Sequence, residues 1–175
     1  MNNFVDVNKD IEEIYSEISE LAEKTVKIFT ERGLKLAAAE SCTGGMISAA
    51  VTAVPGSSAV TEFGLCSYSN RIKHEVLGVK EETLAQHTEY SSECAEEMAQ
   101  GARRVSGADI AVSTTGVAGP SGGTASAPVG TVFIGVSAPR GTIGRRFSYS
   151  GGREEIRAAA VRDALMLLLI AADSN

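Results

Sequence analysis

Short apolar segments alternate with segments of helical spacing along most of this chain, and that alternation limits its fold more than any other feature. Short apolar segments predict strands at residues 34–39, 63–69, 110–113, 131–137 and 143–149. Helical patterns or capping signals predict helices at residues 10–31, 44–54, 70–76, 81–86, 91–105 and 153–172. Such an order predicts an α/β sandwich with a mostly parallel sheet, and the turn at 139–141 adds one antiparallel strand.

The length and composition are typical of one soluble globular domain. The chain has 175 residues, of which 43% are apolar and 22% are charged. We expect a single domain over residues 1–175, with the helix of residues 1–33 packed on it. There is no apolar run of about 18 residues that predicts a membrane span, and no signal-peptide pattern at the N-terminus. We therefore expect a cytoplasmic protein that does not bind membranes.

The charge balance argues against some partners. With 22 acids and 16 bases the net charge is −6, whereas a dedicated DNA-binding domain carries a basic excess, so no direct binding of nucleic acid is expected. Acids are nevertheless absent from residues 110–153, and Glu62 is the only one in residues 41–74. These two stretches either line a site for an anion or merely contain buried strands.

The sequence offers no pattern for a metal or a cofactor. Its three cysteines are far apart, and neither of its two histidines belongs to a ligand set. Neither a metal nor an organic cofactor is expected.

A serine follows the first predicted strand, in the segment AESCTGG at residues 39–45. A turn from a strand into a glycine-rich helix start presents backbone N–H groups at the positive end of the helix dipole, where they can hold an oxyanion or a phosphate. Ser41 is the candidate nucleophile. The candidate binding groups are those of Cys42, Thr43, Gly44 and Gly45. A plain capping turn, with Thr43 as the cap, is the alternative interpretation.

A lysine lies near the start of the helix predicted at 70–76. The positive end of a helix dipole disfavours the protonated form of Lys73, and partial burial would make it a usable base. Tyr68 leaves the preceding strand and offers a proton or a hydrogen bond. The alternative is a surface lysine beside a tyrosine at the edge of the core.

A glycine-rich loop at residues 114–130 and a group of arginines are the remaining candidates. Long loops in compact domains are usually functional, although this one lacks the dinucleotide fingerprint. Arginine forks suit a phosphate or a carboxylate. The arginines are Arg145, Arg146 and Arg153. Surface charges on an edge strand and a helix start are the alternative.

The motifs AESCTGG, PGSS, YSNxxKxxxLGV, TGVAGPxGG and PVGTV, in this order, resemble the CinA C-terminal domain family from about Leu34 to the last helix. Members of that family that act alone include the PncC-type nicotinamide-nucleotide amidases, and the chain is similar in size to this stand-alone form. The resemblance implies a three-layer α/β/α sandwich with a mixed sheet. It also implies hydrolysis of nicotinamide mononucleotide to nicotinate mononucleotide and ammonia.

The resemblance also implies roles for individual residues. Ser41 and Lys73 match the serine–lysine arrangement of the family, and Tyr68 matches its motif tyrosine. Thr115 and Gly116 match the start of its glycine-loop motif. In this interpretation Ser41 attacks the carboxamide carbon, while neutral Lys73, or Tyr68 poised by it, takes the hydroxyl proton.

Two other functions stay open at the level of sequence. One is a non-catalytic nucleotide-binding module, or a partner protein associated with competence or DNA damage. A binding-only relative should have lost Ser41 or Lys73, and this chain has both. The other is an amidase for a different pyridine or nucleotide amide. A homodimer is an open alternative to a monomer.

Overall fold

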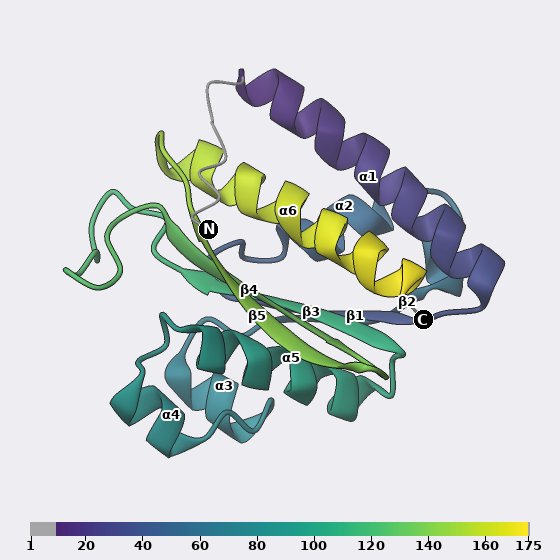
Figure 1. The fold of residues 1–175 in the computed structure, drawn as a ribbon. Helices are drawn as coiled ribbons and strands as arrows, with labels where there is room; N and C mark the ends of the chain where they lie inside the picture. The colour runs from purple at the N-terminus through teal and green to yellow at the C-terminus, as the bar shows by residue number, and fades with distance from the viewer. Residues whose placement is uncertain (1–9, 175) are drawn as a thin grey trace.

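The computed structural model describes residues 10–174, and within this range the centre of the molecule is a five-stranded sheet in the order β2-β1-β3-β4-β5 (Figure 1). Its strands are β1 (Leu36–Glu40), β2 (Thr61–Cys66), β3 (Ile110–Gly116), β4 (Thr131–Ala138) and β5 (Gly141–Ser148). β1 is parallel to β2 and β3, whereas β4 is antiparallel to β3 and β5. Of the described strands β4 alone runs against the others, so the mixed, mostly parallel sheet is confirmed.

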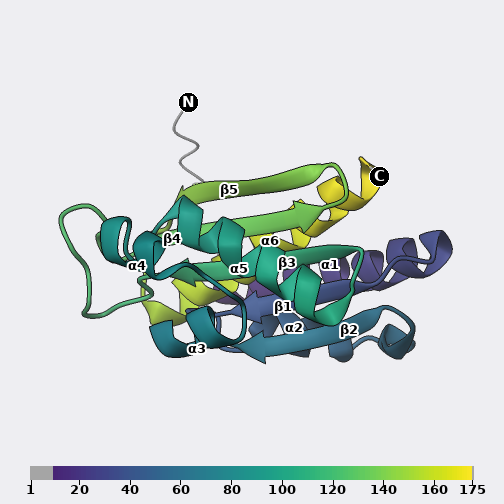
Figure 2. The same ribbon diagram turned by 90° about the horizontal axis from the view of Figure 1, so that it is seen from below.

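Helices cover both faces of this sheet (Figures 1 and 2). One face carries α1 (Ile11–Arg32), α2 (Met46–Thr52) and α6 (Arg153–Asp173). The other carries α3 (Asn70–Glu75), α4 (Glu81–Gln86) and α5 (Ser92–Ser106). A 3-10 turn, η1 (Ser57–Ala59), precedes β2. The predicted three-layer α/β/α sandwich is confirmed.

The first and last helices form one side of the sandwich. α1 is amphipathic, and its buried residues, which include Ile14, Ile18 and Phe29, face the core. Asp10 caps its start by accepting a hydrogen bond from the Glu12 amide, and Gly33 ends it in the left-handed conformation with φ +65°. α6 lies between α1 and the sheet, which explains why most of its residues are buried. None of the helices within residues 10–174 is long and apolar enough to cross a lipid bilayer.

The boundaries near the carboxyl end of β1 differ from the prediction in a way that affects the site. α2 begins at Met46 rather than at residue 44, and its N-cap is Gly45, with φ +96°. The alternative in which Thr43 caps this helix is not found, because Gly45 is the N-cap and the Thr43 hydroxyl donates to the carboxylate of Glu40 at 2.7 Å. The short predicted strand at 110–113 continues to Gly116, so β3 reaches the same edge of the sheet as Ser41.

Candidate active site

The side chains of Ser41 and Lys73 meet at the carboxyl edge of β1. Lys73 Nζ lies 3.0 Å from Ser41 Oγ. The same nitrogen lies 3.0 Å from the carbonyl oxygen of Ser67 and 3.3 Å from that of Tyr68. Although it belongs to a short helix at the edge of the sandwich, Lys73 is only 1% exposed. The structure therefore brings together two residues that are 32 positions apart in the sequence.

The surroundings of Lys73 favour its neutral form. Burial lowers the pKa of its ammonium group, and the charge of Glu89 opposes this shift. Burial raises the pKa of the Cys42 and Cys94 thiols to about 12, so neither is an anion at neutral pH. A neutral amine has two N–H donors and one lone pair. In the ammonium form Nζ donates to all three oxygens. In the neutral form the two carbonyl oxygens would take the donors, and the lone pair would be left for the Ser41 hydroxyl.

Glu40, directly before Ser41, organises the turn that holds the serine. Its carboxylate is fully buried. It accepts hydrogen bonds of 2.7–3.0 Å from the hydroxyls of Thr43 and Ser48 and from the amides of Gly45, Ile47 and Ser48. No lysine, arginine or histidine of residues 10–174 forms an ion pair with it. The carboxylate therefore occupies the start of α2, where an external anion would otherwise bind the free amides. Glu40 is the acid of the AESCTGG motif and was not among the predicted site residues.

This arrangement changes which backbone groups are available to a ligand. The Gly45 amide is bound to Glu40, and the Gly44 amide donates to the Ser41 carbonyl oxygen at 3.2 Å. Among the hydrogen bonds of residues 10–174, none joins the amide of Cys42 or Thr43 to an acceptor on another residue. Of the four amides singled out in the sequence, these two are the ones that the turn leaves uncommitted.

An arginine outside the predicted set supports the same turn from α6. Arg157 donates from Nε to the Cys42 carbonyl oxygen at 3.1 Å and from a terminal nitrogen to that of Thr43 at 2.8 Å. Arg157 follows Arg153 by one helical turn, so the helical period was the signal that could have identified it.

Of the predicted arginines, Arg153 lies next to Tyr68. Its guanidinium donates to the Gly119 carbonyl oxygen at 2.8 Å and lies 3.4 Å from the Tyr68 hydroxyl. Both Arg153 and Tyr68 are exposed, the tyrosine by 64%. The hydroxyl of Tyr68 is thus paired with Arg153, while its carbonyl contacts Lys73.

The other two arginines project to opposite faces of β5. Arg146 donates to the Ser126 carbonyl oxygen at 3.0 Å and lies over the ring of Phe133. Arg145 lines a hollow between β5 and α6 together with Ile143 and Ile170. Neighbouring side chains on a strand alternate between faces, so the two arginines cannot hold one ligand together.

The two residues predicted at the start of the glycine loop are held by the surrounding structure and offer no unpaired side-chain donor. The Thr115 hydroxyl donates to the Glu89 carbonyl oxygen at 2.7 Å. Gly116 packs tightly against β4, because a Cβ atom there would lie 2.4 Å from the Thr131 carbonyl oxygen. The Thr115 contact brings residues 89 and 90, just before α5, to the same edge of the sheet. No local pattern in the sequence pointed to these two residues.

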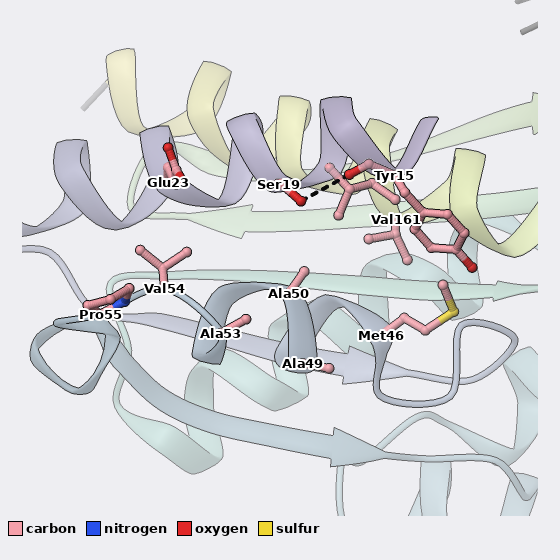
Figure 3. A pocket seen from close by; sticks show the side chains of 11 residues that line it. Tyr15, Ser19, Glu23, Met46, Ala49, Ala50, Ala53, Val54, Pro55 and Val161 are labelled. Atoms are coloured by element: carbon pink, nitrogen blue, oxygen red, sulfur yellow. Dashed lines mark hydrogen bonds between the residues drawn. The ribbon is translucent and has the colours of Figure 1, made fainter. Parts of the chain in front are cut away.

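A separate groove lies between α1 and α2 (Figure 3). Its volume is about 430 Å³, and side chains of α1, α2 and α6 line it. The side chains of Ala49 and Ala50 on α2, and of Ala53 directly after it, are too short to fill this space. Neither Ser41 nor Lys73 belongs to its lining.

Comparisons with known proteins agree on one family. The model of the CinA C-terminal domain matches residues 18–171. A CinA-like protein of Anaeromyxobacter sp. (strain K) is 47% identical over 152 residues, which are 87% of this chain and 37% of that protein. A CinA-like protein of Thermotoga maritima is 47% identical over 148 residues, 85% of this chain and 35% of that protein. The chain thus spans little more than a third of these curated relatives.

Solved structures indicate the same family, and the superpositions cover nearly the whole length of those structures. The competence/damage inducible protein CihA from Agrobacterium tumefaciens superposes with a TM-score of 0.86 at 45% identity, covering 90% of this chain and 96% of that one. A CinA superfamily protein from Klebsiella pneumoniae has a TM-score of 0.86 at 35% identity, covering 90% and 99%. This chain belongs to the CinA C-terminal domain family.

Proposed function

We propose that the protein is an amidase that hydrolyses nicotinamide mononucleotide to nicotinate mononucleotide and ammonia. The observation that carries the proposal is the buried contact of 3.0 Å between Lys73 Nζ and Ser41 Oγ. A serine becomes a nucleophile when a base takes its proton, and a lysine serves as that base when burial keeps it neutral. Membership of the CinA family and the motif resemblance support the choice of substrate.

The first half of the reaction forms an acyl-enzyme. Neutral Lys73 accepts the hydroxyl proton as Ser41 Oγ attacks the carboxamide carbon. The resulting ammonium is held by the carbonyl oxygens of Ser67 and Tyr68. When the C–N bond breaks, its electron pair stays with the nitrogen. The nitrogen takes from Lys73 the proton that came from Ser41, and it leaves as ammonia.

The second half releases the acid. Lys73, neutral again, takes a proton from water, and the hydroxide attacks the ester carbon. The C–O bond to Ser41 breaks, and Oγ recovers its proton from Lys73. The product carboxylic acid then ionises. These steps need no metal and no organic cofactor.

The oxyanion of both tetrahedral intermediates needs donors near Ser41. The amides of Cys42 and Thr43 are suited to this task, because the turn leaves them uncommitted. Glu40 and Arg157 hold this turn from two sides and so act as positioning residues.

Arg153 is the proposed contact for the phosphate of the nucleotide. It is exposed, lies beside Tyr68 and carries the charge that an anion requires. The start of α2 is a poor alternative, since the carboxylate of Glu40 already occupies it. The ring of Tyr68 next to Arg153 offers an apolar surface for a pyridine ring.

The direct test is release of ammonia from nicotinamide mononucleotide by the purified protein. We expect turnover by the wild-type protein and none by a Ser41→Ala variant. Binding of the nucleotide without turnover by the wild type would favour the non-catalytic module instead. Turnover of other pyridine amides in preference to the nucleotide would contradict the assigned substrate and leave the serine–lysine chemistry in place.

A further inference from the structure

A carboxylate that the proposed reaction does not use lies near the Ser41–Lys73 pair. We propose that Glu89 lets the site distinguish the amide that it consumes from the acid that it produces. Its carboxylate accepts a hydrogen bond from the carboxamide nitrogen of the substrate and repels the carboxylate of the product. This inference rests on the amidase function and adds a specificity-determining residue to it.

The backbone of Glu89 is fixed beside the strand that neighbours Ser41. Thr115 Oγ1 donates to the Glu89 carbonyl oxygen at 2.7 Å. Glu40 of β1 pairs with Thr114 of β3, and the Ser41 amide donates to the Thr114 carbonyl oxygen at 2.9 Å. Thr115 is therefore the lateral neighbour of Ser41. Because side chains alternate along strands, both point away from the face on which Glu40 and Thr114 meet Thr43.

The side chain of Glu89 contacts the helix that carries Lys73. Asn70 Nδ2 donates to Glu89 Oε2 at 3.3 Å. Asn70 precedes Lys73 by three residues, so the two side chains lie on the same side of α3. Glu89 is half-buried, and no lysine, arginine or histidine of residues 10–174 forms an ion pair with it. Its carboxylate thus has Asn70 as a hydrogen-bond partner but no ion-pair partner among the described residues.

The charge of Glu89 acts on the groups around the site. It raises the pKa of Lys73 against the larger and opposite effect of burial. Together with burial, which is the larger cause, it also raises the pKa of Tyr90. Tyr90 is in turn close enough to Tyr68 to interact electrostatically with it. The carboxylate therefore belongs to the same cluster as the proposed base and the exposed tyrosine.

The chain holds Glu89 in place at the cost of a strained neighbour. Thr88 has φ +66°, a conformation that β-branched residues rarely adopt. Its hydroxyl accepts a hydrogen bond from the Tyr90 amide at 3.2 Å, and its carbonyl accepts one from the Ser91 hydroxyl at 3.0 Å. Strain of this kind persists where the surrounding structure places a functional side chain.

The chemistry of substrate and product explains what a carboxylate does here. A carboxamide is neutral and has two N–H donors, whereas an ionised carboxylate can only accept. Glu89 can thus orient the amide nitrogen before Ser41 attacks. After hydrolysis the same position faces a negative charge and disfavours it. Glu89 gives and takes no proton in these steps, so the balance of the reaction is unchanged.

Binding to an inactive protein tests this inference without turnover. We would titrate nicotinamide mononucleotide and nicotinate mononucleotide into Ser41→Ala protein by calorimetry, and then repeat the titrations with Glu89→Gln added. The control adds Glu82→Gln, which removes the same charge from an exposed position on α4. We expect Glu89→Gln to shift the affinity ratio by about tenfold toward the acid, as one like charge a few ångströms away predicts. The control should leave the ratio unchanged.

The outcomes separate this inference from the amidase proposal. An unchanged ratio in Glu89→Gln, with wild-type turnover intact, contradicts the role of Glu89 alone. Absence of binding by either nucleotide contradicts both proposals. Glu89→Asp, which keeps the charge, should retain the preference for the amide. If Glu89→Gln does not fold, Glu89→Ala removes the same charge, and an unchanged ratio there is equally contradictory.

Discussion

Lys73 Nζ lies 3.0 Å from Ser41 Oγ while two backbone carbonyl oxygens occupy its remaining contacts. In the proposed mechanism this geometry offers the lone pair of a neutral Lys73 to the serine hydroxyl. It also supplies two acceptors that stabilise the ammonium formed after proton transfer. The relationship leads to the first two predictions.

Replacing the nucleophile should abolish the reaction without disturbing the fold. Ser41→Ala removes one hydroxyl at a turn that Glu40 and Arg157 hold independently. We expect ammonia release to fall by about three orders of magnitude or more, with an unchanged circular dichroism spectrum. Activity within tenfold of the wild type would rule out covalent catalysis at Ser41.

The pH dependence should report the titration of Lys73. Burial lowers the pKa of this ammonium below its usual value, and the reactive form is the neutral amine. The rate should therefore rise with pH as one proton is lost and level off above the lowered pKa. Lys73→Arg should be nearly inactive at every pH, because a guanidinium does not lose its proton in this range. Normal turnover by Lys73→Arg would remove Lys73 from the role of base.

The phosphate preference should depend on Arg153 and not on Arg145. Loss of one charge-assisted contact in Arg153→Ala should weaken binding of nicotinamide mononucleotide by about ten- to a hundredfold. Binding of nicotinamide riboside, which has no phosphate, should change little. Arg145→Ala is the matched control, because that side chain lies in the hollow between β5 and α6. Competition assays with both ligands measure the effect, and equal discrimination by Arg153→Ala and the wild type would require another phosphate contact.

The buried carboxylate of Glu40 should be needed for stability as well as activity. Glu40→Gln replaces one acceptor oxygen with an NH₂ group, which is a donor, at a position to which only donors point. We expect a loss of about 2–4 kcal/mol in the free energy of unfolding. Glu62→Gln, at an exposed position on β2, should change it by less than about 0.5 kcal/mol. Urea denaturation of the two variants provides the comparison, and equal midpoints would mean that the five hydrogen bonds of Glu40 contribute nothing net.

The fold was predictable because it follows from local patterns. The alternation of apolar and amphipathic segments was sufficient to predict an α/β sandwich. The turn at residues 139–141 was sufficient to predict the antiparallel strand. Residue patterns marked Ser41 and Lys73 as two separate candidates, one at a glycine-rich turn and one near a helix start. The resemblance to the CinA family then joined them into one site.

The missed features depend on contacts between distant segments. Glu89 reaches the site through a hydrogen bond from Thr115, 26 residues later, and no spacing in the sequence encodes that contact. The role of Glu40 was not predicted, because the sequence does not show which hydrogen-bond donors surround an acid at the end of a strand. The arginines were grouped by sequence proximity, although the two-residue period of a strand already separates Arg145 from Arg146.

The loop that connects β3 to β4 begins and ends at the same edge of the sheet, the edge at which Ser41 lies. Gly116 pairs with Val132, and the Val117 amide donates to the Thr131 carbonyl oxygen, so the base of the loop is closed by the sheet itself. Residues can be inserted into or removed from the loop without sliding any strand against its neighbour. The loop beside Arg153 can therefore vary in length and in side chains while Ser41 and Lys73 keep their positions. If the proposed function holds, substrate preference can change through this loop alone.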